Sequence, residues 1–190
     1  MAATSCKKLI VILLAFTTVS INSIAQEYVS PTKAPEKGKA PGLKSKIISE
    51  NKQSVTYMLV FAKGDEVISG LTDFAEKNQI KSASFTAIGS AQSSKFGWYD
   101  KEKKMFKVIP VDKQSEITSL IGDIASYQNK PVVHTHITLG MDDGSIKGGH
   151  LLEAHVWPTL EVTMTVHKQE LYKKLDQEVG VTTIDLDAKQ

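Results

Sequence analysis

The sequence predicts an α+β fold, with a central antiparallel sheet and one main helix, in a chain of 190 residues. Several short segments rich in β-branched and aromatic residues are separated by turn-forming residues, as strands joined by hairpins are. Only one long stretch, 66–78, carries apolar residues at helical spacing. A further stretch, 159–167, alternates apolar and polar residues, as a strand with one buried face does. These features together favour a helix packed on an antiparallel sheet.

The first 25 residues have the layout of a secretory signal peptide. Two lysines precede an apolar run that begins at Leu9 and is too short to span a bilayer comfortably. Small residues at Ser23 and Ala25 occupy the two positions that signal peptidase reads. We therefore expect cleavage before Gln26 and export to the periplasm or the extracellular space. An uncleaved membrane anchor is the alternative.

Cleavage would change the composition of the chain. Cys6 is the only cysteine, so the mature chain would have neither disulfides nor thiolate metal ligands. Loss of Lys7 and Lys8 changes the balance from 23 basic against 21 acidic residues to 21 against 21. Every basic residue is lysine, so the guanidinium fork that binds phosphate or guanine is missing. A neutral chain without arginine makes nucleic acid an unfavoured partner.

Three further segments complete the predicted domain organisation. Residues 26–51 are rich in lysine and proline and poor in apolar residues, which predicts a flexible leader. Its lysines could touch an anionic surface, although a solvated tether is the favoured interpretation. The folded domain is expected at 52–177, followed by an irregular C-terminal tail at 178–190.

The folded domain is expected to begin with a strand and the main helix. Residues 55–61 are β-branched and aromatic and predict a strand. Asp65 is placed to cap a helix over 66–78. One face of this helix should be buried in the core, and its residues are Val67, Leu71, Phe74 and Ala75.

The middle of the chain predicts a series of strands. They are expected at 80–91, 95–99, 105–111 and 116–125, with a polar hairpin tip at 100–104. Small residues at 87–91 indicate either the close approach of another backbone or ligand, or a β-bulge. After the strands that hold the histidines and the alternating stretch 159–167, a short helix at 169–177 should close the domain.

Three histidines form a candidate metal site. His134 and His136 stand two apart in the predicted strand after Pro131, so their side chains point to the same face. His150 follows two glycines after a turn and could reach them from a neighbouring strand. Three imidazoles at about 2.0–2.1 Å from one ion leave a fourth position for water, as in catalytic zinc sites. The alternative is that these histidines are polar residues on a solvent-facing side of the sheet.

Two carboxylates and two further histidines are candidates for additional members of the site. Glu153 and Glu161 could orient a ligand or serve as a base, and strand parity favours Glu161. His155 and His167 are expected to be surface histidines. The sequence contains no nucleophile elbow, phosphate loop or dinucleotide fingerprint, so it assigns no catalytic residue beyond a possible role for Glu161.

Six ordered segments carry a resemblance to a known family. These are 64–67, 86–91, 97–100, 131–136, 148–153 and 158–162. Over about 52–174 the chain resembles the plants-and-prokaryotes-conserved (PPC) domain. The resemblance implies an α+β domain with a central antiparallel sheet that assembles as a homotrimer. It also implies a zinc-like ion on the histidines matching His134, His136 and His150, as in some prokaryotic members.

The family also carries a nucleic-acid association. In plants the domain follows an AT-hook in nuclear proteins, and prokaryotic members are often labelled DNA-binding by that link. This chain has no arginine, hence no AT-hook, and it has an export signal. We therefore expect an exported homotrimer that binds a divalent metal, zinc, with an open position for a small anionic or carbonyl ligand. The alternatives are a DNA-binding protein and a non-catalytic trimeric interaction scaffold.

Overall fold

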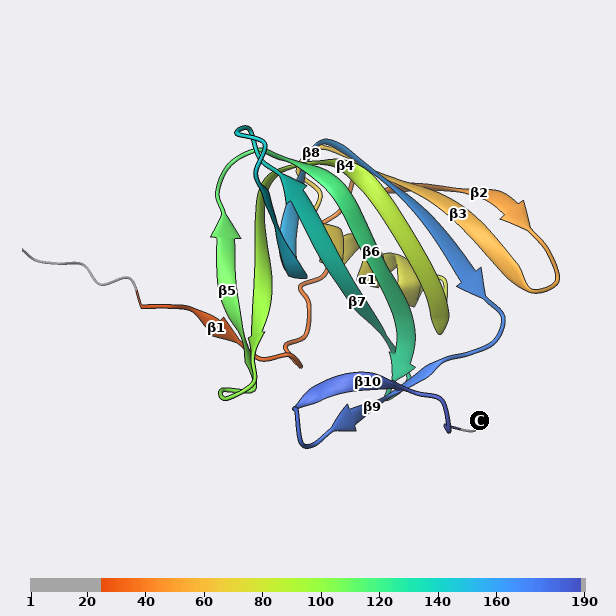
Figure 1. Cartoon of the computed structure of the whole chain (residues 1–190). Helices are drawn as coiled ribbons and strands as arrows, with labels where there is room; N and C mark the ends of the chain where they lie inside the picture. The colour runs from red at the N-terminus through yellow and green to blue at the C-terminus, as the bar shows by residue number, and fades with distance from the viewer. Residues whose placement is uncertain (1–24, 189–190) are drawn as a thin grey trace, which may run out of the picture.

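The computed structural model describes residues 25–188 and has the predicted α+β architecture (Figure 1). Within this range a ten-stranded, mostly antiparallel sheet packs against a single helix. The elements are β1 (Tyr28–Val29), β2 (Lys44–Glu50), β3 (Ser54–Phe61), α1 (Val67–Lys77), β4 (Ser82–Asp100), β5 (Met105–Val111), β6 (Ser115–Tyr127), β7 (Lys130–Gly140), β8 (Ile146–His167), β9 (Tyr172–Asp176) and β10 (Val181–Asp185). The predicted signal peptide lies almost entirely outside the described residues. No helix in the described range is long and apolar enough to cross a membrane.

The two longest strands, β4 and β8, organise the sheet. They pair with each other along almost their whole length, from Ala83 opposite Val166 to Gly97 opposite His150. The β6–β7 hairpin bridges them, because β6 pairs with the first half of β4 and β7 pairs with the start of β8, Ile146–His150. The sheet therefore closes on itself around one core, with β3 and β2 added beside the second half of β8 (Figure 1).

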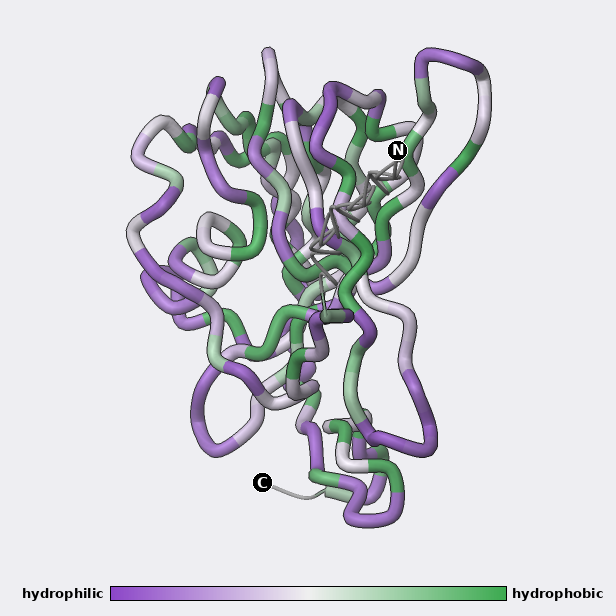
Figure 2. The backbone as a smooth tube through the Cα atoms, turned by 90° about the vertical axis from the view of Figure 1, so that its left-hand side faces the viewer, coloured by the Kyte–Doolittle hydropathy of each residue, from purple (hydrophilic) through white to green (hydrophobic). Residues whose placement is uncertain are grey.

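The core lies on the face of the sheet that α1 covers. The predicted helix stripe is confirmed, since all four of its residues are buried. The predicted alternation is confirmed as well: Leu160, Val162 and Met164 are fully buried, while Glu161 and Thr163 are exposed. Figure 2 shows hydrophobic and hydrophilic stretches alternating through the centre of the molecule, with hydrophilic stretches at several of the outer loops. The three histidines of the predicted site lie on the opposite face of the sheet.

Two predicted interruptions of strands are absent. The segments expected at 80–91 and 95–99 form the single strand β4, whose register shifts between Ala87 and Gly89. Both interpretations of the small residues hold, because a Cβ added at Gly89 would also lie 2.4 Å from the Thr159 carbonyl oxygen. The strand β8 likewise continues through Pro158, which follows a cis peptide bond.

The residue that caps α1 differs from the prediction. Glu66, and not Asp65, is the N-cap: its two carboxylate oxygens accept hydrogen bonds from the backbone N–H groups of Ile68 (3.0 Å) and Ser69 (2.6 Å). The same carboxylate accepts a third bond, 3.2 Å long, from the backbone N–H of Ala154 in β8. Burial raises the pKa of Glu66, and the three bonds oppose that rise. Glu66 thus joins the start of the helix to the sheet.

The prediction of a flexible leader at 26–51 is wrong for much of its length. Residues 44–50 form β2, which pairs with β3 as an edge strand. Further back, the backbone N–H groups of Lys39 and Gly42 donate to the side chains of Ser69 and Asp65. The side chains of β2 are all exposed. The polar composition of this segment predicted disorder. Backbone hydrogen bonds hold it in place instead, and composition gives no information about them.

The predicted helix at 169–177 and the irregular tail after it are also wrong. These residues form a hairpin of β9 and β10 with its turn at 177–180. The Asp176 carboxylate accepts hydrogen bonds from the backbone N–H groups of Glu178 and Val179, and Gly180 has a φ of +68°. A glycine in this left-handed conformation is typical of a tight turn. The hairpin is attached to the end of β6, where Tyr172 pairs with Ser126.

We predict that the Glu66→Gln substitution lowers the free energy of unfolding by about 1–3 kcal/mol, because one buried backbone N–H would then face an amide NH₂ group. Urea unfolding followed by circular dichroism measures this. Glu76→Gln, on the same helix, is the control, because it removes only an exposed ion pair with Lys37 and should cost less than about 1 kcal/mol. Equal losses in the two variants would contradict the capping role.

Candidate metal centre

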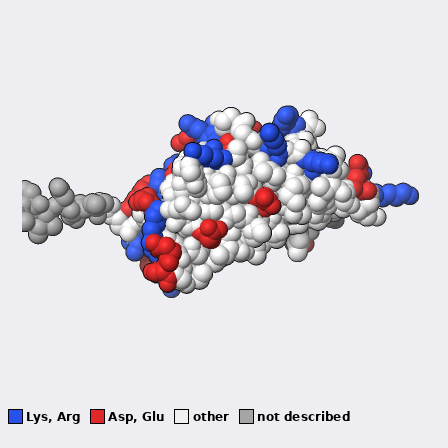
Figure 3. All heavy atoms as spheres, turned by 90° about the horizontal axis from the view of Figure 1, so that it is seen from above, with Lys and Arg blue, Asp and Glu red and all other residues white. Residues whose placement is uncertain are grey.

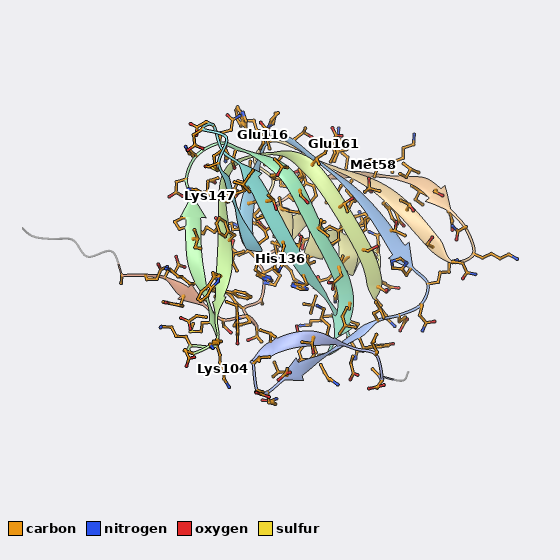
Figure 4. All side chains as sticks on the ribbon, in the orientation of Figure 1. Met58, Lys104, Glu116, His136, Lys147 and Glu161 are labelled. Atoms are coloured by element: carbon orange, nitrogen blue, oxygen red, sulfur yellow. The ribbon has the colours of Figure 1, made fainter. Side chains whose placement is uncertain are left out.

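The three predicted histidines converge on one point of the face opposite α1. His134 and His136 come from β7, and His150 comes from β8, where it pairs directly with His136. Their candidate ligand nitrogens all lie within 4.8 Å of one another. The ring centroids are 5.4, 5.4 and 5.5 Å apart, so the three rings form a nearly equilateral triangle. Figure 4 shows His136 projecting from β7 into the space above the β9–β10 hairpin.

Local packing holds the histidines in this arrangement. Thr135 and Ile137 are buried on the core side of β7, which turns the two histidines of this strand outward. Two glycines, Gly148 and Gly149, bring His150 close to the histidines of β7. A Cβ at Gly148 would lie 2.3 Å from the Ile137 carbonyl oxygen, and one at Gly149 would lie 2.8 Å from the Gly97 carbonyl oxygen. Only glycine therefore allows β8 to fit this tightly between β7 and β4.

The site favours neutral imidazoles, the form that can bind a cation. Burial, and after it the neighbouring His134 and His136, lower the pKa of His150 to about 4. The pKa of His136 is also lowered, by burial and then by His134. Lone pairs on these rings are therefore available near neutral pH.

Two neighbours orient the imidazoles. The carboxylate oxygen Oδ2 of Asp123, on β6, lies 3.3 Å from Nδ1 of His134. A proton on Nδ1 facing this carboxylate leaves Nε2 of His134 as the metal ligand, the usual carboxylate–histidine–metal arrangement. Burial acts to raise the pKa of Asp123, but the contacts with His134 and Lys173 outweigh it and lower the pKa. The ring of Phe106 stacks on His150, with centroids 4.3 Å apart and planes at 6°.

A lysine completes the surroundings. Lys173 comes from β9, its side chain is only 2% exposed, and its Nζ lies 3.4 Å from Oδ1 of Asp123. Sequence reasoning missed Asp123, Phe106 and Lys173. For Asp123 a signal existed, since it is the only charged residue between Glu116 and the hairpin turn that precedes the histidine strand.

The donor set fits a divalent metal ion. Ligand nitrogens on an ion with bonds of about 2.0–2.1 Å stand roughly 3.3 Å apart in tetrahedral geometry, so each nitrogen would move inward by about 1 Å or less. Side-chain rotation can supply a movement of this size. The Asp123 contact on His134 is the support that such ligands ordinarily receive.

The other candidates do not join the site. Glu161 stands eleven positions beyond His150 on the continuous strand β8, roughly 35 Å of strand length, and Figure 4 shows it at the upper end of the sheet, away from His136. Glu153 contacts Lys95 and His155 instead. His155 is partly exposed, and His167 is exposed and contacts the hydroxyl of Ser84. The prediction of Glu161 relied on strand parity, which does not take this distance along β8 into account.

Comparison with solved structures identifies proteins of similar fold. A protein from Ralstonia eutropha named "putative DNA-binding protein" is 34% identical, covers 68% of this chain and 90% of its own, and has a TM-score of 0.65. A plant- and prokaryote-conserved (PPC) protein from Pyrococcus horikoshii is 28% identical, with 75% and 100% covered and a TM-score of 0.67. A metal-containing protein from Archaeoglobus fulgidus is 26% identical, with 74% and 96% covered and a TM-score of 0.62.

The sequence itself assigns the family. None of the curated proteins matches the chain significantly in sequence. Residues 48–168, more than half of the chain, match the model of the Plants and Prokaryotes Conserved (PCC) domain, the family called PPC above. The closed sheet with one helix agrees with the solved relatives. The chain belongs to the plants-and-prokaryotes-conserved domain family.

Proposed function

We propose that this protein is an exported homotrimer that binds one divalent metal ion, zinc, through His134, His136 and His150. The fourth position of the ion would take a small anionic or carbonyl ligand. The observation that carries this proposal is the convergence of three histidine nitrogens within 4.8 Å, beside a carboxylate that orients one of them. The name of the Archaeoglobus fulgidus relative, a metal-containing protein, agrees with it.

The chemistry of the donors favours zinc. All three are imidazoles, which suit zinc, copper, nickel and iron. Zinc has no electronic preference for a particular geometry, and sites with three protein ligands and one open position are characteristic of it. When bound, the ion would act as a Lewis acid toward the ligand in its fourth position.

An uncharged row of side chains supports the trimer. In register across the sheet, Met58, Thr163, Thr86 and Ile121 lead to His136, and directly paired residues point to the same face. Ile121 is 60% exposed and Ile88, nearby on β4, is 65% exposed. Figure 3, viewed from above, shows few charged side chains across the middle of the surface and most of them at its margins. Exposed apolar side chains on a sheet face are typical of a subunit interface.

DNA binding is the second candidate. The name of the Ralstonia eutropha relative favours it and opposes the expectation that nucleic acid is not a partner. The chain would have to bind phosphates with lysines alone, because it has no arginine. Affinity of this kind falls steeply as salt is added.

We predict that purified protein loaded with zinc and then dialysed holds about one zinc per chain, and that His136→Ala retains less than about a tenth of that, because a site of two histidines binds the ion far more weakly. Elemental analysis by mass spectrometry measures the zinc content. His167→Ala is the matched control, since this histidine is exposed and remote from the site, and it should retain the full content. A wild-type protein without zinc after loading would refute the metal site.

We predict that the wild-type protein elutes with the mass of a trimer in light scattering coupled to gel filtration. Ile121→Lys should shift the mass to that of a monomer, because the interface would bury an unpaired ammonium group. Leu186→Lys, at a position that is 86% exposed beyond β10, should leave the trimer intact. A monomeric wild type, or a trimeric Ile121→Lys variant, would contradict this use of the sheet face.

We predict no retardation of duplex DNA by the protein at low ionic strength in a gel-shift assay, because a chain with 21 basic and 21 acidic residues after signal cleavage has no net attraction to phosphates. Retardation that disappears on addition of salt would favour the second candidate instead. The same titration with zinc-loaded and zinc-free protein shows whether the ion contributes.

A further inference from the structure

We propose that the open position of the metal site selects a small carboxylate over a neutral carbonyl compound, and that Lys173 is the residue responsible. This inference rests on the proposed function, because it names the class of ligand that the three-histidine site would take. It assigns a role to a residue outside the matched family domain, which ends at residue 168.

The first observation is the burial of Lys173. Its side chain is 2% exposed, although a lysine is almost never fully buried unless it is paired. Among residues 25–188, its Nζ atom forms one ion pair, 3.4 Å long, with Oδ1 of Asp123. This oxygen is itself buried and accepts no hydrogen bond from the described part of the chain, so the contact is not well aligned. A buried ammonium group with unused donors is costly unless a further acceptor satisfies it.

The second observation is the position of this ammonium group beside the histidines. The carboxylate of Asp123 faces Lys173 with one oxygen and Nδ1 of His134 with the other, at 3.4 and 3.3 Å. Asp123 thus connects a buried ammonium group to one of the three proposed ligands, so Lys173 borders the site.

The third observation is the balance of charge. Asp123 offsets Lys173, and the imidazoles are neutral ligands, so the two positive charges of the metal ion remain uncompensated. A carboxylate in the fourth position compensates part of this charge and offers a second oxygen to the unused N–H groups of Lys173. A neutral carbonyl compound offers one oxygen and no charge.

The fourth observation is that the β9–β10 hairpin is fixed in place. The hydroxyl of Tyr99 donates to the carbonyl oxygen of Val179 in the hairpin turn, and Tyr172 pairs with Ser126 at the end of β6. Figure 4 shows the hairpin along the lower border of the face that carries His136. Lys173 is thus held at the site by anchors on two sides, β4 and β6.

The experiment uses the full chain loaded with Co²⁺, whose visible absorption changes when a ligand enters its coordination sphere. Acetate and acetamide, which have nearly the same shape, are titrated into the wild type and two variants. Acetate should bind the wild type at least about tenfold more tightly than acetamide does, and Lys173→Met should weaken acetate by about tenfold or more, as expected for loss of a charged hydrogen bond. Lys174→Met is the matched control. This neighbouring lysine is 60% exposed and pairs with Asp185, so acetate affinity should not change.

The outcomes separate the inference from the proposed function. A wild type that takes up no Co²⁺ would overturn the proposed function and this inference with it. Uptake of Co²⁺ by wild type and Lys173→Met, with the same acetate affinity in both, would overturn the inference alone. If circular dichroism shows that Lys173→Met does not fold, the wild type still decides, because equal affinity for acetate and acetamide would overturn the selection of an anion.

Discussion

The register of β7 between β6 and β8 is the constraint on which the site depends. Pairing places Ile121, His136 and His150 in one row across three strands. The side chains of a strand alternate between its faces, so a slip of one residue would turn both histidines of β7 into the core. It would also expose Thr135 and Ile137, which are now buried. Burial of one face of β7 thus fixes the position of the imidazoles on the other.

The sequence allowed the main features of this arrangement to be predicted. Spacing of two along a strand determines that His134 and His136 share a face, and the glycines before His150 indicated a close approach that the structure contains. Asp123 could have been found in the same way. Tyr127 pairs with Lys130 across the turn at 128–129, and counting outward from this pair places Asp123 opposite His134.

The features that escaped prediction depend on contacts that local sequence does not record. The strand β2 has only exposed side chains and is held by backbone pairing with β3, so its composition resembled that of a flexible segment. The strand β9 was predicted as a helix and β10 as part of an irregular tail, because a run as short as Tyr172–Asp176 fits either period. The position of Lys173 follows from that hairpin and could not be predicted without it. The matched family domain therefore supplies the three histidines, and the segment after it supplies the neighbouring cation.

X-ray absorption at the zinc edge of the zinc-loaded protein tests the central claim most directly, because it reports the atoms bound to the ion. The three-histidine site predicts three imidazole nitrogens at about 2.0–2.1 Å, with the outer-shell scattering of imidazole rings, and one further light atom. The same spectrum should lose an imidazole contribution in the His136→Ala variant. A shell of oxygen atoms without imidazole scattering would place the ion elsewhere and contradict the account.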